Sequence, residues 1–228
     1  MENLKRLLAL EAKYQIDDRL FDELLSGGTE VALTTYEAMI DAGEYNPDIF
    51  VVKKGLVRGT YLDKNSEKTV GFALPGTLLM SLHCYYGNEP SYYRFEACFA
   101  TEVIRIPRSW FDGLIEREHE FARWVMSANQ NQLYYNEFRS RLLSGDAKSR
   151  FVQLTRRLSE ITPEVPADII ASGLGVGRCH HHRVKSEMYS RWKEVLLLVP
   201  SKIIASYLGI TEQHLSKIKR ELLHEGMG

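Results

Sequence analysis

The sequence predicts an α+β protein with an antiparallel β-roll of the jelly-roll type, a long helix and an all-α C-terminal domain. Three observations predict this fold class. Short alternating apolar runs between turn residues lie within 49–106. An apolar spacing of seven residues follows over 114–142, and one helical segment occurs twice near the C-terminus. We therefore expect three parts, at residues 1–110, 111–144 and 145–228.

The composition is typical of a soluble globular protein: of 228 residues, 44% are hydrophobic and 26% are charged. It excludes a collagen, a disordered tail and a disulfide scaffold. We expect neither a membrane span nor a signal peptide, because no apolar run is long enough for either. Three scattered cysteines without a CxxC pair argue against a cysteine-bound metal site and predict a reducing cytoplasm: Cys84, Cys98 and Cys179.

The net charge of −1 hides an asymmetry between the two ends of the chain. Residues 139–228 hold 15 Lys and Arg against 9 Asp and Glu, whereas residues 1–138 hold 14 against 21. A basic C-terminal region indicates a polyanionic partner such as nucleic acid. A chance scatter of surface charge is the alternative.

The N-terminal part begins with a helix that Asp17 can cap, followed by strand signals. Alternating residues over 57–61 and 70–74 flank the turn 63–66, which predicts a β-hairpin. A last strand over 102–106 ends at Pro107. Short strands at this spacing predict a small antiparallel barrel or roll.

The seven-residue spacing predicts one helix from Ile115 to Leu143, about 43 Å long. We interpret it as a dimerisation helix, because a small roll does not cover so long a seam. An intrachain packing helix is the alternative. The helix ends near 144–146, and its expected seam consists of Leu114, Phe121, Trp124, Ala128, Tyr135, Phe138 and Leu142.

An internal repeat is the sharpest signal: 165–188 recurs as 199–222, at an offset of 34 residues. The second copy predicts two helices. The first starts at Pro200, Gly209 makes the turn, and Thr211 caps the second helix. Leu215, Ile218 and Leu222 would face inward and polar residues outward, as in a helix–turn–helix. An ordinary αα-hairpin with a wet polar face is the alternative.

The segment 203–211, followed by 215–219, resembles the DNA-binding unit of the Crp/Fnr superfamily of bacterial regulators. Segments 54–59, 71–76 and 89–93 resemble the roll of that family, and 146–151 resembles the segment after its long helix. The resemblance covers nearly the whole chain. It implies a cupin-like jelly roll that senses an effector, a homodimer, and double-stranded DNA and RNA polymerase as partners.

The resemblance also implies roles for the second helix of the repeat. Gln213 would bond adenine, Lys217 guanine and Glu212 cytosine. The phosphate contacts would come from Thr211, Ser216, Lys219 and Arg220.

The effector pocket implied by the resemblance comprises Gly76, Thr77, Leu78, Ser91, Tyr92 and Tyr93. Nucleotide-binding members carry a Gly-Glu pair for the ribose and an Arg-Ser or Arg-Thr pair for the phosphate. Here Gly76-Thr77 and Ser91-Tyr92 stand in those places, and Arg94 is out of register. We therefore expect no cyclic AMP, and no iron–sulfur cluster because the cysteine quartet is absent. The effector itself stays unidentified.

The first copy, 165–188, lacks the signals of the second: Gly173 replaces Tyr207, Gly177 replaces Thr211 and His181 replaces Leu215. We expect the second copy to contact DNA. The first would be a spacer, a dimer contact or a decaying duplicate, and a pair that both touch DNA is a further alternative.

Other chemistry is weakly indicated. The run 178–183 holds one cysteine and three histidines, but consecutive histidines on a helix point in different directions and suit a metal poorly. No catalytic arrangement stands out, so we do not expect an enzyme. The alternative function is a ligand-binding or interaction protein that has lost DNA binding and uses its C-terminal helices for assembly.

Overall fold

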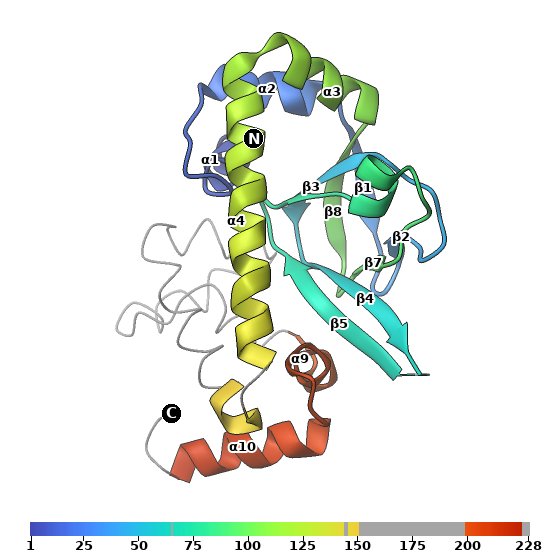
Figure 1. The fold of residues 1–228 in the computed structure, drawn as a ribbon, viewed down its shortest axis with the longest axis vertical. Helices are drawn as coiled ribbons and strands as arrows, with labels where there is room; N and C mark the ends of the chain where they lie inside the picture. Colours follow the sequence, from blue (N-terminus) through green and yellow to red (C-terminus); the bar gives the residue numbers. More distant parts are fainter. Residues whose placement is uncertain (65, 144–145, 151–198, 225–228) are drawn as a thin grey trace.

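The computed structural model describes residues 1–64, 66–143, 146–150 and 199–224. The first repeat copy and the 178–183 cluster lie outside these residues. Eight strands form two four-stranded antiparallel sheets (Figure 1). One sheet has the order β1 (Thr29–Leu33), β8 (Thr101–Ile106), β3 (Ile49–Lys54), β6 (Leu78–Leu79). The other has the order β2 (Ala38–Ile40), β7 (Arg94–Ala97), β4 (Val57–Asp63), β5 (Ser66–Ala73). The predicted β-roll is confirmed.

The hairpin of β4 and β5 forms where the alternation predicts it. Val57 pairs with Ala73 and Asp63 with Ser66. The register shifts between Gly59 and Thr60, so Val70 is an extra residue in β5, which makes a β-bulge. Because β5 is the edge strand of its sheet, no strand within the described residues pairs with the other side of its backbone.

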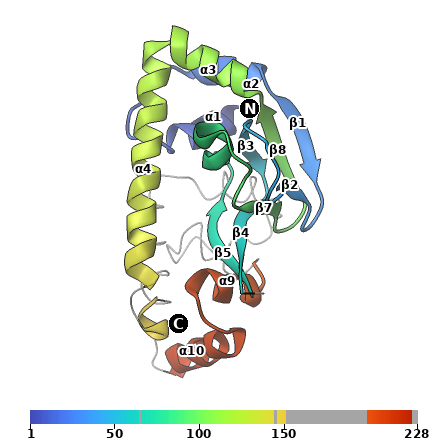
Figure 2. The same cartoon turned by 45° about the vertical axis from the view of Figure 1, so that its right-hand side comes forward.

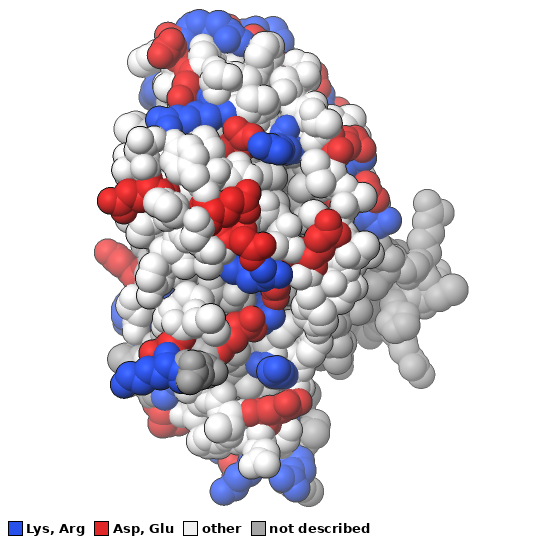
Figure 3. Space-filling model, turned by 90° about the vertical axis from the view of Figure 1, so that its right-hand side faces the viewer, with Lys and Arg blue, Asp and Glu red and all other residues white. Residues whose placement is uncertain are grey.

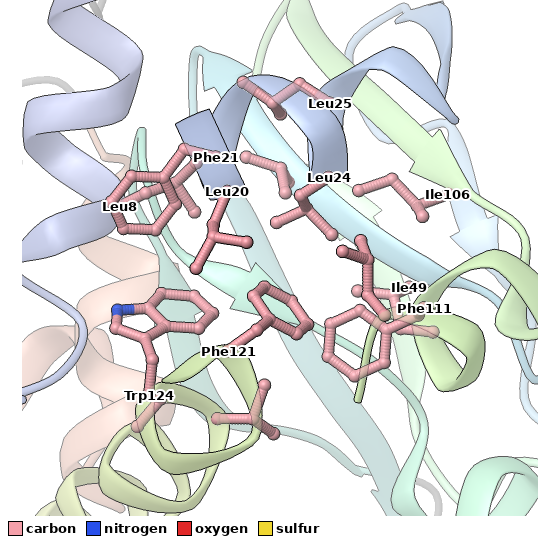
Figure 4. Packing of buried hydrophobic residues seen from close by; sticks show 14 of the residues in the cluster. Leu8, Leu20, Phe21, Leu24, Leu25, Ile49, Ile106, Phe111, Phe121 and Trp124 are labelled. Carbon is pink, nitrogen blue, oxygen red and sulfur yellow. The ribbon is translucent and has the colours of Figure 1, made fainter. Parts of the chain in front are cut away.

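Two N-terminal helices cover one end of the roll: α1 (Glu2–Ala9) and α2 (Asp18–Ser26). As predicted, the Asp17 carboxylate caps α2, accepting a hydrogen bond from the amide of Arg19 at 2.7 Å. Helix α2 buries its apolar face against an aromatic cluster (Figure 4). Phe21 meets Trp124 edge-on at 5.3 Å, and the rings of Phe121 and Trp124 stack at 5.6 Å.

The single helix expected from Ile115 is in fact two helices, α3 (Arg108–Arg117) and α4 (His119–Leu143). Glu118 between them is extended, with φ −118° and ψ 95°, and breaks the helical path. Leu114 therefore belongs to α3, and only α4 runs along the length of the molecule (Figure 2).

The expected dimer seam is wrong for four of its side chains. Leu114, Phe121 and Trp124 are fully buried within this chain, and Ala128 is 7% exposed. They pack into the cluster that α1 and α2 share with the roll, so helices of the same chain cover them. Tyr135 is exposed, while the side chains of Phe138 and Leu142 lie outside the described part.

Two further helices, α9 (Ser201–Leu208) and α10 (Glu212–His224), lie at the far end of α4 (Figure 1). Helix α9 packs against β5, and α10 packs against α9. Within the described ranges, no helix is both long and apolar enough to cross a membrane.

Candidate nucleic-acid interface

The turn between α9 and α10 is built as the sequence predicts. Pro200 precedes the first turn of α9, where a missing N–H costs nothing. Gly209 ends α9 with φ +65°, a left-handed conformation that favours glycine. Thr211 caps α10, since its hydroxyl accepts a hydrogen bond from the amide of His214 at 3.2 Å.

A small apolar core holds the two helices together. Leu208 and Leu215 are fully buried, and Ile218 is nearly so. Arg150 adds a polar tie, since its Nη1 donates to the carbonyl of Leu208 at 2.7 Å. This bond gives the last carbonyl of α9 a donor that its own helix cannot supply, and α10 packs against α9.

The outward face of α10 consists of the exposed residues Thr211, Glu212, Gln213, Ser216, Lys217 and Arg220. Lys217 makes a long contact of 3.9 Å with Glu221 within its own helix. Lys219 differs from the expectation. It is half-buried, and its ammonium donates to the Ser201 hydroxyl at 3.4 Å. The face thus presents an amide, a carboxylate, hydroxyls and cations, the groups that contact base edges and phosphates.

The roll offers a different surface. On the face drawn in Figure 3, Lys and Arg are interspersed with Asp and Glu. In the roll, lysines and arginines pair with carboxylates, as Lys53 does with Glu30 at 2.7 Å. A mixed surface of this kind does not favour a polyanion.

The expected effector residues fall into two groups. In the first, Ser91, Tyr92 and Tyr93 lie directly before β7. Ser91 is buried and its hydroxyl lies 2.8 Å from that of Ser81. Tyr92 stacks on His83 at 5.9 Å, and Tyr93 meets Tyr92 edge-on at 5.1 Å. These rings form a surface ring cluster, which consists of Tyr61, His83, Tyr92 and Tyr93.

The second group faces the N-terminal helices instead. Gly76 has φ +88°, and a Cβ placed there would lie 2.3 Å from the side chain of Leu7 in α1. The hydroxyl of Thr77 contacts the Glu11 carboxylate at 3.4 Å, and Leu78 packs against the core of α1 and α2. These three residues support packing of α1, and no described contact joins them to the surface ring cluster.

Two arginines of the neighbouring strands β4 and β7, Arg58 and Arg94, already have carboxylate partners. Arg94 Nε donates to Glu96 at 2.7 Å, and its Nη1 contacts Asp41. Arg58 Nε donates to Glu96 at 2.8 Å, and its Nη2 lies 2.8 Å from Glu67. Since Glu96 and Arg58 are both buried, these cations serve the fold.

Sequence reasoning missed three residues that join the helices to the roll. Ser206 and Tyr207 of α9 and Arg139 of α4 all contact β5 or a side chain upon it. Serine and tyrosine on a helix face carry no signal for such contacts, because the partners belong to a strand far away in the sequence: backbone groups for Ser206 and the Phe72 ring for Tyr207.

Comparisons with known proteins place this architecture. FixK2 from Bradyrhizobium japonicum superposes with a TM-score of 0.61 at 19% identity, covering 87% of this chain and 86% of that one. CLP from Xanthomonas campestris, described as a c-di-GMP responsive global regulator, gives 0.63 at 14% identity, covering 92% and 93%. A CooA mutant from Carboxydothermus hydrogenoformans gives 0.57 at 14% identity, covering 89% and 79%.

The chain has the Crp/Fnr fold. No protein-family model matches the sequence. No curated protein matches it significantly. The expected resemblance is therefore confirmed at the level of the fold.

Proposed function

We propose that this chain is a homodimeric, sequence-specific DNA-binding transcription regulator with an effector-sensing roll. One observation carries the proposal: the outward face of α10 is polar and exposed, and α10 packs on α9 through buried apolar side chains. Helix–turn–helix proteins place such a helix in the major groove, with its first residues on base edges.

The roles on α10 follow from position and chemistry. Gln213, Lys217 and Glu212 lie in the first turns and contact bases, as the resemblance implies. Thr211, Ser216 and Arg220 contact phosphates. Lys219 reaches a phosphate after leaving Ser201, since an ammonium at 3.4 Å from a hydroxyl is weakly held.

Dimerisation is proposed through the exposed side of α4. Met126 is 56% exposed and Leu133, seven residues on, is 65% exposed. Tyr134 lies beside them and is also exposed. Apolar side chains seven residues apart on a long helix form a seam with a second copy. Two copies would present two α10 helices to half-sites about 34 Å apart.

The effector is proposed to bind at the surface ring cluster and to differ from cyclic AMP. Stacked and edge-on rings suit a planar or apolar molecule. A cyclic phosphate calls for an unpaired guanidinium, and Arg94 is committed to Asp41 and Glu96. RNA polymerase is the remaining proposed partner, because a regulator of this kind acts on transcription.

Selection of duplex DNA from a random pool, with and without cell extract, tests the function. We expect a palindromic site to be enriched. Anisotropy titration of that site should show affinity falling steeply with salt, because bound cations displace counterions. The double variant Gln213→Ala/Lys217→Ala should weaken specific binding at least about tenfold. Lys13→Ala, at an exposed lysine before α2, is the matched control and should bind normally.

The proposal fails if no sequence is enriched under either condition and the affinity hardly changes with salt. It also fails if the double variant on α10 binds as tightly as Lys13→Ala. Those outcomes favour the alternative, in which the C-terminal helices serve assembly.

A further inference from the structure

The edge of strand β5 is occupied by side chains from two helices. Ser206 of α9 accepts a hydrogen bond from the amide of Thr69 at 2.8 Å and donates one to the carbonyl of Glu67 at 3.1 Å. Its single hydroxyl thus uses both its donor and an acceptor site on adjacent groups of one strand edge. Arg139 of α4 donates to the carbonyl of Thr69 at 3.0 Å.

An aromatic contact lies beside these hydrogen bonds. The ring of Tyr207 packs on Phe72 of β5 at 5.2 Å, and the Arg139 guanidinium lies 5.4 Å from the same tyrosine ring. Below them, Ile203 and Ile204 are buried with Cys98 and other apolar residues of the roll. Helix α9 is therefore bonded to the roll by polar, aromatic and apolar contacts together.

The partners in the roll are themselves fixed. Arg58 lies 3.4 Å from the Thr69 hydroxyl, and the buried Glu96 holds that guanidinium in place. Val70, the extra residue of the bulge, directly follows Thr69, and bulges locally change the direction of a strand edge. The edge that meets Ser206 is thus set by the bulge and by the contact of Thr69 with Arg58.

We propose that this edge, the socket formed by Glu67, Thr69, Phe72 and Arg139, docks α9 and thereby sets the orientation of α10 for DNA binding. The inference rests on the proposed function. Because α10 packs on α9 through the buried Leu208 and Leu215, holding α9 in place also places the outward face of α10, which is exposed in this docked arrangement. An undocked pair would sample many orientations, and only a fraction would fit two half-sites at once.

The socket also distinguishes the two repeat copies at one position. Ser206 aligns with Ser172 of the first copy, but Tyr207 aligns with Gly173. Glycine has no ring to place on Phe72, so the second copy alone carries the full set of docking side chains. This supports the second copy as the one that contacts DNA.

Two variants test the socket from its two sides. Ser206→Ala/Tyr207→Ala removes the docking side chains but keeps good helix formers and leaves the buried Ile203, Ile204, Leu208 and Leu215 in place. Phe72→Ala acts from the roll, where no direct DNA contact is proposed. Tyr45→Ala, at an exposed tyrosine bonded to Asn88, is the matched control.

The measurements are amide hydrogen exchange over 66–73 and anisotropy with the selected duplex. We expect both variants to exchange faster over β5 and to bind DNA about tenfold more weakly, while Tyr45→Ala does neither. Unchanged exchange would overturn the docking, and faster exchange with unchanged affinity would overturn its role in orientation. If the unaltered protein selects no DNA, the proposed function fails, whereas the exchange result still decides whether α9 docks.

Discussion

Arg58 and Glu96 form an ion pair that is buried in the sheet of β4 and β7, with Nε of the arginine 2.8 Å from the carboxylate. Glu96 pairs with Arg94 through its other oxygen, so one buried carboxylate holds two guanidinium groups. A buried ion pair adds little net stability over apolar residues, but breaking it leaves a charge without water or partner.

We therefore predict that Glu96→Ala lowers the free energy of unfolding by about 3 kcal/mol, because the buried Arg58 loses its buried partner and keeps the more exposed Glu67. The double variant Arg58→Met/Glu96→Leu should be less destabilised than the single one. Urea denaturation followed by circular dichroism measures both. The pairing would be contradicted if the double variant lost as much free energy of unfolding as the single variants Arg58→Met and Glu96→Leu lose together.

Gly76 is expected to be intolerant of a side chain. Its φ is +88° and a Cβ would lie 2.3 Å from Leu7, so Gly76→Ala strains the backbone and pushes α1 away from the roll. We predict a loss of about 2 kcal/mol in the free energy of unfolding. Gly71→Ala is the control, because φ is ordinary there and a Cβ placed on Gly71 would meet no other residue within 4 Å. The midpoint of its thermal unfolding should hardly change.

The two sides of α4 are predicted to behave differently. Phe121→Ala opens a cavity in the core and should cost about 3–5 kcal/mol of stability without changing the molecular mass in solution. Met126→Glu/Leu133→Glu places charges on the exposed side and should convert a dimer to a monomer at micromolar concentration, with little effect on stability. Light scattering and denaturation separate the two effects. Leu62→Glu, at a 77% exposed leucine of the hairpin, is the control.

Cys98 is predicted to resist thiol reagents in the folded protein. Burial raises the pKa of its thiol to about 12, with Glu96 also raising it and Arg58 lowering it. The folded-state pKa thus lies above the ordinary value of 9.0. The stability that the buried neutral thiol contributes is therefore fully present below about pH 9 and is lost as the pH rises from about 9 to 12.

Labelling at pH 8 followed by peptide mass spectrometry measures this protection. Cys98 shares its buried cluster with Ile203 and Ile204, so Ser206→Ala/Tyr207→Ala should accelerate its labelling, whereas Tyr45→Ala should not. Rapid labelling of Cys98 in the unaltered protein would show that α9 does not cover it in solution.

Local signals determined much of this protein from its sequence alone. The cap at Asp17, the β4–β5 hairpin and the α9–Gly209–Thr211–α10 turn each depend on a few adjacent residues, and each is found as predicted. Leu215 and Ile218 face inward because helical periodicity alone decides it. Such features follow from capping, turn and periodicity rules that act within a few residues.

Tertiary structure alone decided which partner each apolar or polar face meets. Periodicity marked Phe121 and Trp124 as apolar but could not tell a second copy from α2 of the same chain, and α2 is what covers them. Likewise, no spacing in the sequence joins Ser206 to Thr69, which is 137 residues away. Such contacts depend on where a distant strand leaves its edge unpaired, and only the assembled fold brings that edge and its helix together.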